Sequence, residues 1–436
     1  MSRILYVSYD GMLEPLGQSQ VLPYLRGLAP AHYIVLMSFE KPRDLRERAH
    51  IAALARELRQ ARIDWVRLLY HRRPTMPATA YDVLRGILAG WRLCRAHRIE
   101  IVHARGYVPG VIAWWLKRLT GAKFLFDMRG FWPEEKADAG HWRRDGLPYR
   151  LAKRWERILC QSADGLVSLT RAGLEALPKL GLSLGRATAT AVIPTCADLT
   201  RFAPGPKDPA LVAHYHLKRR FVLGCVGTLS GWYLRRETLE VLAGLLRQWD
   251  DAAVLMVTHE DHRALRRDAE AAGIAPDRLV LTSAGFADMP AHIRLMDLGV
   301  FLIMPTMAKR ASAPTKLAEF LGCGMPVLIN DGVGDSGGIV RASRVGVVLA
   351  EPTAVQAARQ IEELRALLAD PALAQRCRET ARQRFDLPEA VSEYHRLYAR
   401  MLGHDTVEDH PTSPADGPRR RTLAVSATAA TTRSGR

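Results

Sequence analysis

The segment Ser312–Leu328 combines a helix start, a cation and a carboxylate at a spacing suited to phosphate and sugar. Pro314 and Thr315 are typical of a first helical turn, where proline costs no hydrogen bond and the backbone N–H groups stay free. Such a start attracts anions, and Lys316 adds a full positive charge. Glu319 follows one turn later on the same face and can accept hydrogen bonds from sugar hydroxyls. The pattern predicts a nucleotide-sugar site.

The same spacing also fits an ordinary helix and strand unit in which Lys316 and Glu319 form a solvated pair, because charge pairs three residues apart are common on helices. The helix is expected to end at Gly322 and Gly324, before a buried strand at 326–329. Spacing alone leaves both interpretations open.

The segment resembles the donor-binding signature of GT-B-fold glycosyltransferases, above all the retaining family 4, in the form S-x-P-T/S-K-x-x-E-Y/F-x-x-x-G-x-P-V that begins at Ser312. In that family the second glutamate of a Glu-seven-residues-Glu motif binds the donor ribose, and it matches Glu319. The neighbouring basic residue and amides hold the diphosphate, which implies this role for Lys316 and Thr315. The first glutamate would fall on Ala311, a departure that the proline-threonine-lysine branch of the family commonly shares.

Three further segments follow predicted strands, at the sheet edge where ligand-binding α/β proteins place their chemistry. The likeness matches Gly17 to a glycine whose amide meets the donor phosphate, and a plain strand-to-helix turn is the alternative. His103 and Arg105 follow the fourth strand, although a lone histidine is more often structural. Asp127 and Arg129 lie in a turn similar to the family's D-x-R-G/D-x-W-x-E, and such side chains suit sugar hydroxyls and phosphate. A structural ion pair is the alternative for these two.

Additional phosphate contacts have several candidates. The family often carries an arginine and a lysine in the loop after the first strand of the second half, where Thr228 replaces the arginine. Arg235 or Arg236 is an alternative source of charge, and Lys309 and Arg310 are the better candidates.

A metal site is not expected, because His259 and His262 lack further ligands at metal spacing and no Asp-x-Asp suited to a diphosphate-bound metal occurs. The six cysteines are scattered without zinc spacing, which fits buried thiols in a reducing compartment. We predict no metal and no cofactor.

The net charge of +17 is concentrated in the first half, where residues 1–196 carry 31 lysines and arginines against 17 acidic residues. Nucleic acid, a phosphorylated glycan and an anionic membrane would each match this charge, and an arginine-rich genome would produce part of it. Two basic amphipathic segments, residues 71–98 and 147–161, favour peripheral contact with anionic lipid, with core-packing helices as the alternative. Nucleic acid is not expected, since no aromatic-interleaved basic patch or helix-turn-helix pattern occurs.

The sequence shows neither a signal peptide nor an apolar run of 18 residues. The predicted location is therefore the cytoplasm, extending to the inner face of the membrane.

Apolar runs and helical patterns alternate in both halves, which predicts an α/β protein with parallel sheets covered on both faces. With the resemblance, which spans roughly residues 1–402, the expected architecture is GT-B: two Rossmann-like domains facing a central cleft. The expected parts are an acceptor-binding domain (1–198), a linker (199–220), a nucleotide-sugar-binding domain (221–387), a helix crossing back to the first domain (388–402) and a disordered tail (403–436).

We therefore predict a retaining, metal-independent glycosyltransferase that uses a nucleotide diphosphate sugar and a glycan or lipid-linked acceptor in cell-surface polysaccharide or glycolipid synthesis. The predicted catalytic residues are His103, Asp127 and Arg129, and the predicted donor-binding residues are Gly17, Arg310, Ser312, Thr315, Lys316 and Glu319. A sugar-nucleotide epimerase on the same fold and a noncatalytic nucleotide-sugar-binding subunit are the alternatives, and Ala311 is the best argument for the second.

Overall fold

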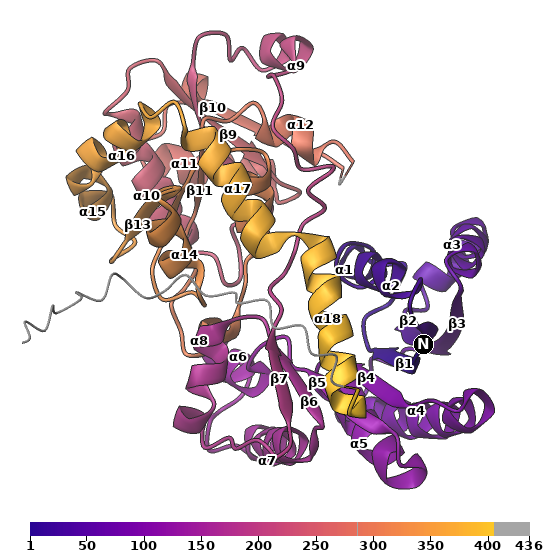
Figure 1. Cartoon of the computed structure of the whole chain (residues 1–436). Coiled ribbons are helices and arrows are strands. Elements are labelled where there is room, and N and C mark those ends of the chain that lie inside the picture. The colour runs from indigo at the N-terminus through magenta and orange to yellow at the C-terminus, as the bar shows by residue number, and fades with distance from the viewer. Residues whose placement is uncertain (286, 405–436) are drawn as a thin grey trace, which may run out of the picture.

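Two parallel β-sheets organise the two halves of the molecule (Figure 1). The computed structural model describes residues 1–285 and 287–404, and within them one sheet has seven strands in the order β3-β2-β1-β4-β5-β6-β7. The other has six, in the order β10-β9-β8-β11-β12-β13. All neighbouring strands in both sheets are parallel. The predicted α/β class with two Rossmann-like sheets is confirmed.

The first sheet is apolar on both faces. Its strands are β1 (Arg3–Ser8), β2 (Tyr33–Glu40), β3 (Ile63–Leu69), β4 (Ile101–Arg105), β5 (Lys123–Asp127), β6 (Gly165–Ser168) and β7 (Ala189–Val192). The helices of this half are α1 (Pro15–Gln20), α2 (Leu22–Leu28), α3 (Arg48–Gln60), α4 (Thr75–His97), α5 (Tyr107–Thr120), α6 (Trp132–Asp138), α7 (Leu147–Ser162) and α8 (Arg171–Ala176). Leu5 and Val7 share a core with α4, α5 and α7, whereas Ile4 and Tyr6 share another with α2 and α3. Consecutive residues point to opposite faces, so a strand covered on both sides is a continuous apolar run.

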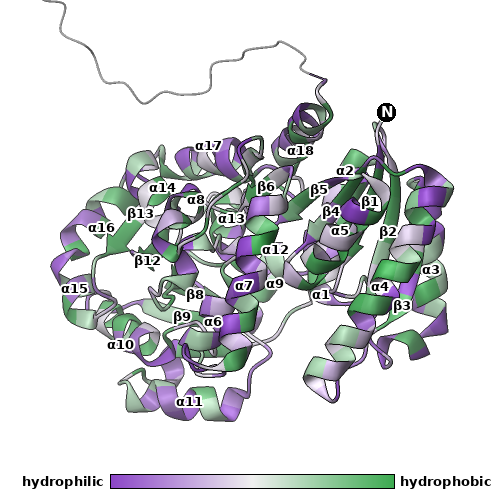
Figure 2. Cartoon of the chain, turned by 90° about the horizontal axis from the view of Figure 1, so that it is seen from below, coloured by the Kyte–Doolittle hydropathy of each residue, from purple (hydrophilic) through white to green (hydrophobic). Residues whose placement is uncertain are grey.

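The second half repeats this plan, and Figure 2 shows apolar strands between helices of mixed hydropathy in both halves. Its strands are β8 (Phe221–Val226), β9 (Ala252–Val257), β10 (Leu279–Thr282), β11 (Leu298–Phe301), β12 (Val327–Asn330) and β13 (Gly346–Leu349). Its helices are α9 (Pro209–His214), α10 (Arg235–Leu246), α11 (His262–Ala271), α12 (Met289–Ile293), α13 (Thr315–Gly322), α14 (Ser336–Ser343), α15 (Ala354–Arg359), α16 (Ile361–Leu368) and α17 (Leu373–Phe385), and the short 3₁₀ helix η4 (Ala308–Ala311) precedes α13. A Cβ at Gly299 in β11 would lie 2.7 Å from the Phe320 ring, so this glycine lets α13 lie close to the sheet.

The last helix, α18 (Leu387–Leu402), leaves the second half and packs against α2 and β7 of the first. Figure 1 shows it as the yellow helix that continues from α17 along the first domain. Tyr394, Leu397 and Tyr398 are buried in the core that contains Ile4 and Tyr6. The domain limits at residues 198, 220 and 387 stay predictions. From residue 405 onward, the tail that was predicted to be disordered lies outside the described residues. In the described part of the chain no helix is long and apolar enough to cross a membrane.

Candidate functional site

Lys316 occupies the first turn of α13, which begins at Thr315 after the N-cap residue Pro314, as the sequence predicted. The Lys316 ammonium donates to the carbonyl oxygen of Thr228 at 3.0 Å and lies 3.5 Å from the ring centroid of Tyr233. Burial lowers the pKa of Lys316 to about 8. A cation held at this cost is stabilised strongly by an anion placed beside it.

Glu319 lies one turn further along α13. Burial raises the pKa of Glu319 to about 7, against the opposing charges of Lys316 and Arg201. Hydrogen bonds from hydroxyl groups stabilise the ionised form of a carboxyl group, so ribose hydroxyls reaching Glu319 would favour its carboxylate. The two predicted donor residues therefore lie together, and both change charge near neutral pH.

The loop after β8 is held by a carboxylate from the loop after β9. Glu260 accepts hydrogen bonds from the backbone amides of Leu229 and Ser230, at 3.0 and 2.9 Å. Arg235 lies 3.9 Å from the same carboxylate, and the side chain of Arg236 is 80% exposed. Arg235 also pairs with Asp268 at 2.8 Å and Arg236 with Glu237 at 3.0 Å, so both guanidinium groups already have carboxylate partners and have less structural support for phosphate contact than Lys316.

The segment before α13 is tied to the first domain. The Lys309 ammonium forms an ion pair with Glu135 of α6 at 2.8 Å and lies 4.1 Å from the ring centroid of Trp232. The carbonyl oxygen of Arg310 accepts a hydrogen bond from the Thr170 hydroxyl at 2.6 Å, while the Arg310 Nε is buried and makes no hydrogen bond to any described residue. Of the two cations predicted here, Arg310 retains donor capacity for a ligand.

Ala311, where the family's first glutamate would stand, is a packing residue. It is buried in the core of the first domain, and a Cβ at Gly173 of α8 would lie only 3.0 Å from the Ala311 Cβ. The next residue, Ser312, is also tightly packed, because a Cβ at Gly334 would lie 2.2 Å from the Ser312 carbonyl oxygen. A glutamate at position 311 would not fit this contact, which gives the departure a physical reason.

A glutamine that sequence reasoning missed joins the two domains. The Gln20 carbonyl oxygen accepts hydrogen bonds from Arg105 at 3.4 Å and from Arg129 at 3.2 Å. Its amide nitrogen donates to the Thr315 hydroxyl at 3.1 Å, at the start of α13. Predicted residues from both halves, Arg129 and Thr315, are therefore brought together. No sequence signal marks Gln20, because its role depends on three partners from distant segments.

His103 and Asp127 lie deeper, each only 1% exposed. Tyr398 of α18 contacts the His103 Nδ1 at 2.7 Å, and the Tyr394 hydroxyl donates to Asp127 at 3.1 Å. Burial lowers the pKa of His103, which favours the neutral ring. Burial alone would raise the pKa of Asp127, but Arg129 and His103 outweigh it and hold that pKa below its usual value. The crossing helix thus covers two of the three predicted catalytic residues.

A cavity of about 10 Å³ separates this pair from the domain interface, lined among others by Gln20, His103, Asp127, Arg129 and Tyr394. This volume suits about one water molecule and no sugar ring. The Arg129 side chain, 13% exposed against 2% for Asp127, is the more accessible part of this lining, and its φ of 57° is a left-handed conformation uncommon for a long side chain. Of the three predicted catalytic residues, Arg129 is therefore the one placed to meet a substrate.

Gly17 lies in α1 against the preceding loop. A Cβ at this position would be 2.3 Å from the carbonyl oxygen of Gly11, so close packing by itself requires glycine here. Its contact with donor phosphate stays a prediction.

The histidines that follow β9 have backbone partners. His259 contacts the carbonyl oxygen of Ala284 at 3.2 Å, and His262 that of Thr258 at 3.0 Å. Among residues 1–285 and 287–404, no group of three or more His, Cys, Asp or Glu side chains is arranged to hold a metal ion. Metal independence stays a prediction.

Comparison with known proteins places this geometry in context. Residues 20–196 match the family described as "Glycosyl transferase 4-like domain". A search of curated proteins finds no significant match. A solved glycosyltransferase from Rickettsia africae ESF-5 superposes with a TM-score of 0.69 at 14% identity, covering 93% of this chain and 99% of that one.

Two further structures share the fold. Sucrose-phosphate synthase from Thermosynechococcus elongatus has a TM-score of 0.67 at 15% identity, covering 93% of this chain and all of its own. Anabaena HepE, in complex with UDP and glucose, has a TM-score of 0.64 at 17% identity, covering 92% of this chain and all of its own. The architecture is therefore GT-B, and the family match over the first domain together with this fold indicates a glycosyltransferase.

Proposed function

We propose that the protein transfers a sugar from a nucleoside diphosphate donor to an acceptor held by the first domain, with retention and without a metal ion. The observation that carries the proposal is the pair on α13: the Lys316 ammonium lies in the first turn against the Thr228 carbonyl oxygen and the Tyr233 ring, and Glu319 follows one turn later. Their surroundings lower the pKa of Lys316 and raise that of Glu319. A diphosphate would offset the cost of burying the ammonium, and ribose hydroxyls that of the carboxylate. The complexes of HepE with UDP and with UDP-glucose support such a donor.

Charge that grows on the leaving diphosphate would be stabilised by Lys316, Arg310 and the Thr315 amide, the task that a metal ion performs in other enzymes. Ser312 and Gly17 complete the proposed donor contacts. Retention follows from the family resemblance, in which the acceptor attacks from the face that the diphosphate leaves, and no protein nucleophile is assigned.

On the acceptor side, Arg129 is the proposed contact to the acceptor or the transferred sugar. His103 and Asp127, which lie behind it, hold its position through the 3.8 Å approach of Asp127 to Arg129. The proposed acceptor is a glycan or a lipid-linked glycan, in cell-surface polysaccharide or glycolipid synthesis.

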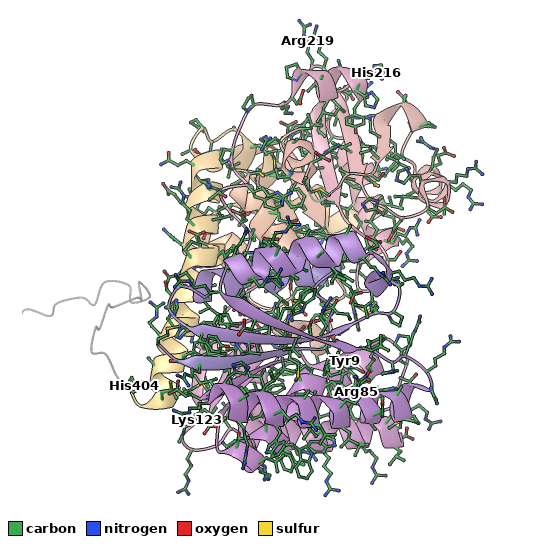
Figure 3. All side chains as sticks on the ribbon, turned by 90° about the vertical axis from the view of Figure 1, so that its right-hand side faces the viewer. Tyr9, Arg85, Lys123, His216, Arg219 and His404 are labelled. Atoms are coloured by element: carbon green, nitrogen blue, oxygen red, sulfur yellow. The ribbon has the colours of Figure 1, made fainter. Side chains whose placement is uncertain are left out.

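A cytoplasmic protein attached to the inner face of the membrane is also proposed, and one face of the first domain supports it. Helices α4, α5 and α7 lie side by side on one side of the sheet and expose large apolar side chains: Leu84, Leu88, Trp115, Leu119 and Leu151. The exposed arginines of the same helices are Arg92, Arg95, Arg118, Arg150, Arg154 and Arg157. Arg85, labelled in Figure 3, also lies on α4. Apolar side chains ringed by cations suit an anionic lipid surface.

One residue of the predicted basic segments does not belong to this surface. Lys153 of α7 is buried and forms ion pairs with Glu156 and, at 3.1 Å, with Glu134. The acidic residues of α4 and α7, Asp82 and Glu156, are both buried, so the outer face of the three helices keeps only positive charge.

The test is a donor and acceptor panel with the purified chain, followed by mass spectrometry. Transfer to a glycan or lipid-linked acceptor that persists in EDTA and is lost in Glu319→Gln would support the proposal. An altered sugar nucleotide formed without acceptor would identify an epimerase. Donor binding without transfer to any acceptor would favour a noncatalytic subunit, and loss of activity in EDTA restored by magnesium would refute metal independence.

A further inference from the structure

We infer that a phosphoryl group binds between Arg105 and Arg129 of the first domain and the start of α13, at the point that the Gln20 amide occupies in this structure. The inference rests on the proposed function and names a group that its site recognises. It follows from the charges around Gln20.

Two guanidinium groups converge on one neutral oxygen. The Gln20 carbonyl oxygen lies 3.4 Å from an Arg105 nitrogen and 3.2 Å from an Arg129 nitrogen. An arginine fork matches phosphate or carboxylate oxygens, and hydrogen bonds to such charged acceptors are about twice as strong as those to a neutral one. A single amide oxygen is therefore a weak partner for two arginines.

The acidic residues nearby do not complete the pairing. Asp10 lies 4.0 Å from the Arg105 Nε, and Asp127 lies 3.8 Å from Arg129. Arg105 is only 7% exposed, and its Nε makes no hydrogen bond to any described residue. Asp127 is already shared with Tyr394. Buried cations normally have hydrogen-bonded anionic partners, so this pair has unused capacity for an anion.

The opposite wall supplies further donors. The Gln20 amide nitrogen donates to the Thr315 hydroxyl, in the first turn of an eight-residue helix whose first N–H groups have no partner within the helix. Such a helix start favours negative charge. An oxyanion that displaced the Gln20 side chain would then be bound by arginines from one domain and by donors from the other.

The phosphoryl group can come from two sources. It is either the second phosphate of the donor, which becomes part of the leaving group, or a phosphate carried by the acceptor. Either source places its charge between the two domains, and binding measurements separate them.

The experiment measures binding by calorimetry. Wild-type protein is titrated with UDP, GDP, ADP and dTDP, and the best nucleotide is compared with its monophosphate. Inorganic phosphate is then titrated into protein saturated with that nucleotide. The variants are Arg105→Gln, Arg129→Gln and Gln20→Glu, whose new carboxylate would compete with the anion. Arg105→Lys restores charge, and the exposed Arg59→Gln in α3 is the matched control.

At least tenfold weaker diphosphate binding in the three variants, with monophosphate binding unchanged, would assign the donor's second phosphate. Loss of inorganic phosphate binding alone would assign an acceptor phosphate. The inference is overturned if the variants bind both probes within twofold of wild type while Glu319→Gln still weakens the nucleotide. Should the two arginine variants fail to fold, Gln20→Glu decides between the same outcomes. Failure of the wild type to bind any nucleotide would refute the proposed function instead, and the phosphate titration would still test the arginines.

Discussion

Replacing Lys316 with methionine should remove the alkaline limb of the pH dependence of donor binding. The ammonium of Lys316 lies beside Thr228 and Tyr233, and burial lowers its pKa from 10.5 to about 8. The protonated form binds the diphosphate, so binding raises this pKa. As far as Lys316 is concerned, affinity is therefore greatest well below pH 8 and falls as the pH rises through that value.

The magnitude follows from the pKa. With a pKa of about 8, about nine-tenths of Lys316 is charged at pH 7 and about one-tenth at pH 9, while Glu319 goes from about half to fully ionised, so wild-type affinity should fall roughly fivefold over this interval, or about 1 kcal/mol. Lys316→Met should bind weakly at both pH values and should not lose affinity between them, because only the ionisation of Glu319 remains, which raises affinity about twofold. Calorimetry in two buffers of different ionisation enthalpy should also detect proton uptake at pH 8.5 in the wild type alone.

Glu319 should produce the acidic limb of the pH dependence of donor binding, which serves as an internal control. Its pKa is raised to about 7 and the proposed ribose contact needs the carboxylate, while Lys316 gains charge over the same range, so affinity should fall roughly fivefold from pH 8 to pH 6, and Glu319→Gln should abolish this fall. A nucleotide sugar is the proper ligand, because its diester phosphates do not titrate in this range. An alkaline limb unchanged in Lys316→Met would refute the placement of Lys316 beside the diphosphate.

Three further predictions concern the surroundings of the site. Ala311→Glu should destabilise the protein by about 3 kcal/mol in denaturant unfolding, because it forces an unpaired carboxylate into a packed contact, whereas a gain in transfer activity would contradict the packing interpretation. Tyr394→Phe removes the hydrogen bond to Asp127 and should cost about 1 to 2 kcal/mol of stability while lowering turnover more than nucleotide affinity; equal effects on both would argue against positioning of the acceptor side. Replacing Leu84 and Leu88 with serine should weaken pelleting with anionic vesicles at least tenfold, since each buried leucine contributes about 1.5 kcal/mol, and pelleting equal to wild type would exclude α4 from the membrane contact.

The sheets could be predicted because each strand is a short apolar run. The strand expected at residues 326–329 spans Val327–Asn330, and the alternating apolar runs of both halves became strands such as Arg3–Ser8 and Phe221–Val226. Such runs are intrinsic to parallel strands buried on both faces. The helix start at Pro314 and Thr315 could be predicted equally well, since proline and the free first turn are local properties.

The burial of His103 and Asp127 could not be predicted in the same way. Their position at strand ends indicated access to ligand, but the side chains that cover them, Tyr398 and Tyr394, come from more than 260 residues away. Two tyrosines four residues apart on a helix look like ordinary core positions. Gln20 was missed for the same reason, because its three partners meet only when both domains are in place.

The structure also bears on the noncatalytic alternative, which is favoured most by the alanine at position 311. If the site were an inactive descendant of an active one, we would expect the glutamate side chain to be missing and an empty space to remain at position 311. Ala311 instead fills a close contact with Gly173, while three cations gather around the same helix start: Lys316 within α13, and Arg105 and Arg129 across the interface through Gln20. Gathering three cations, of which Arg105 is buried and the other two are partly buried, is costly in a protein that binds no anion, and a catalyst that must stabilise a leaving diphosphate has a use for them. Ala311 thus provides a packed contact between the domains, and the cations proposed to stabilise the leaving diphosphate lie beside it.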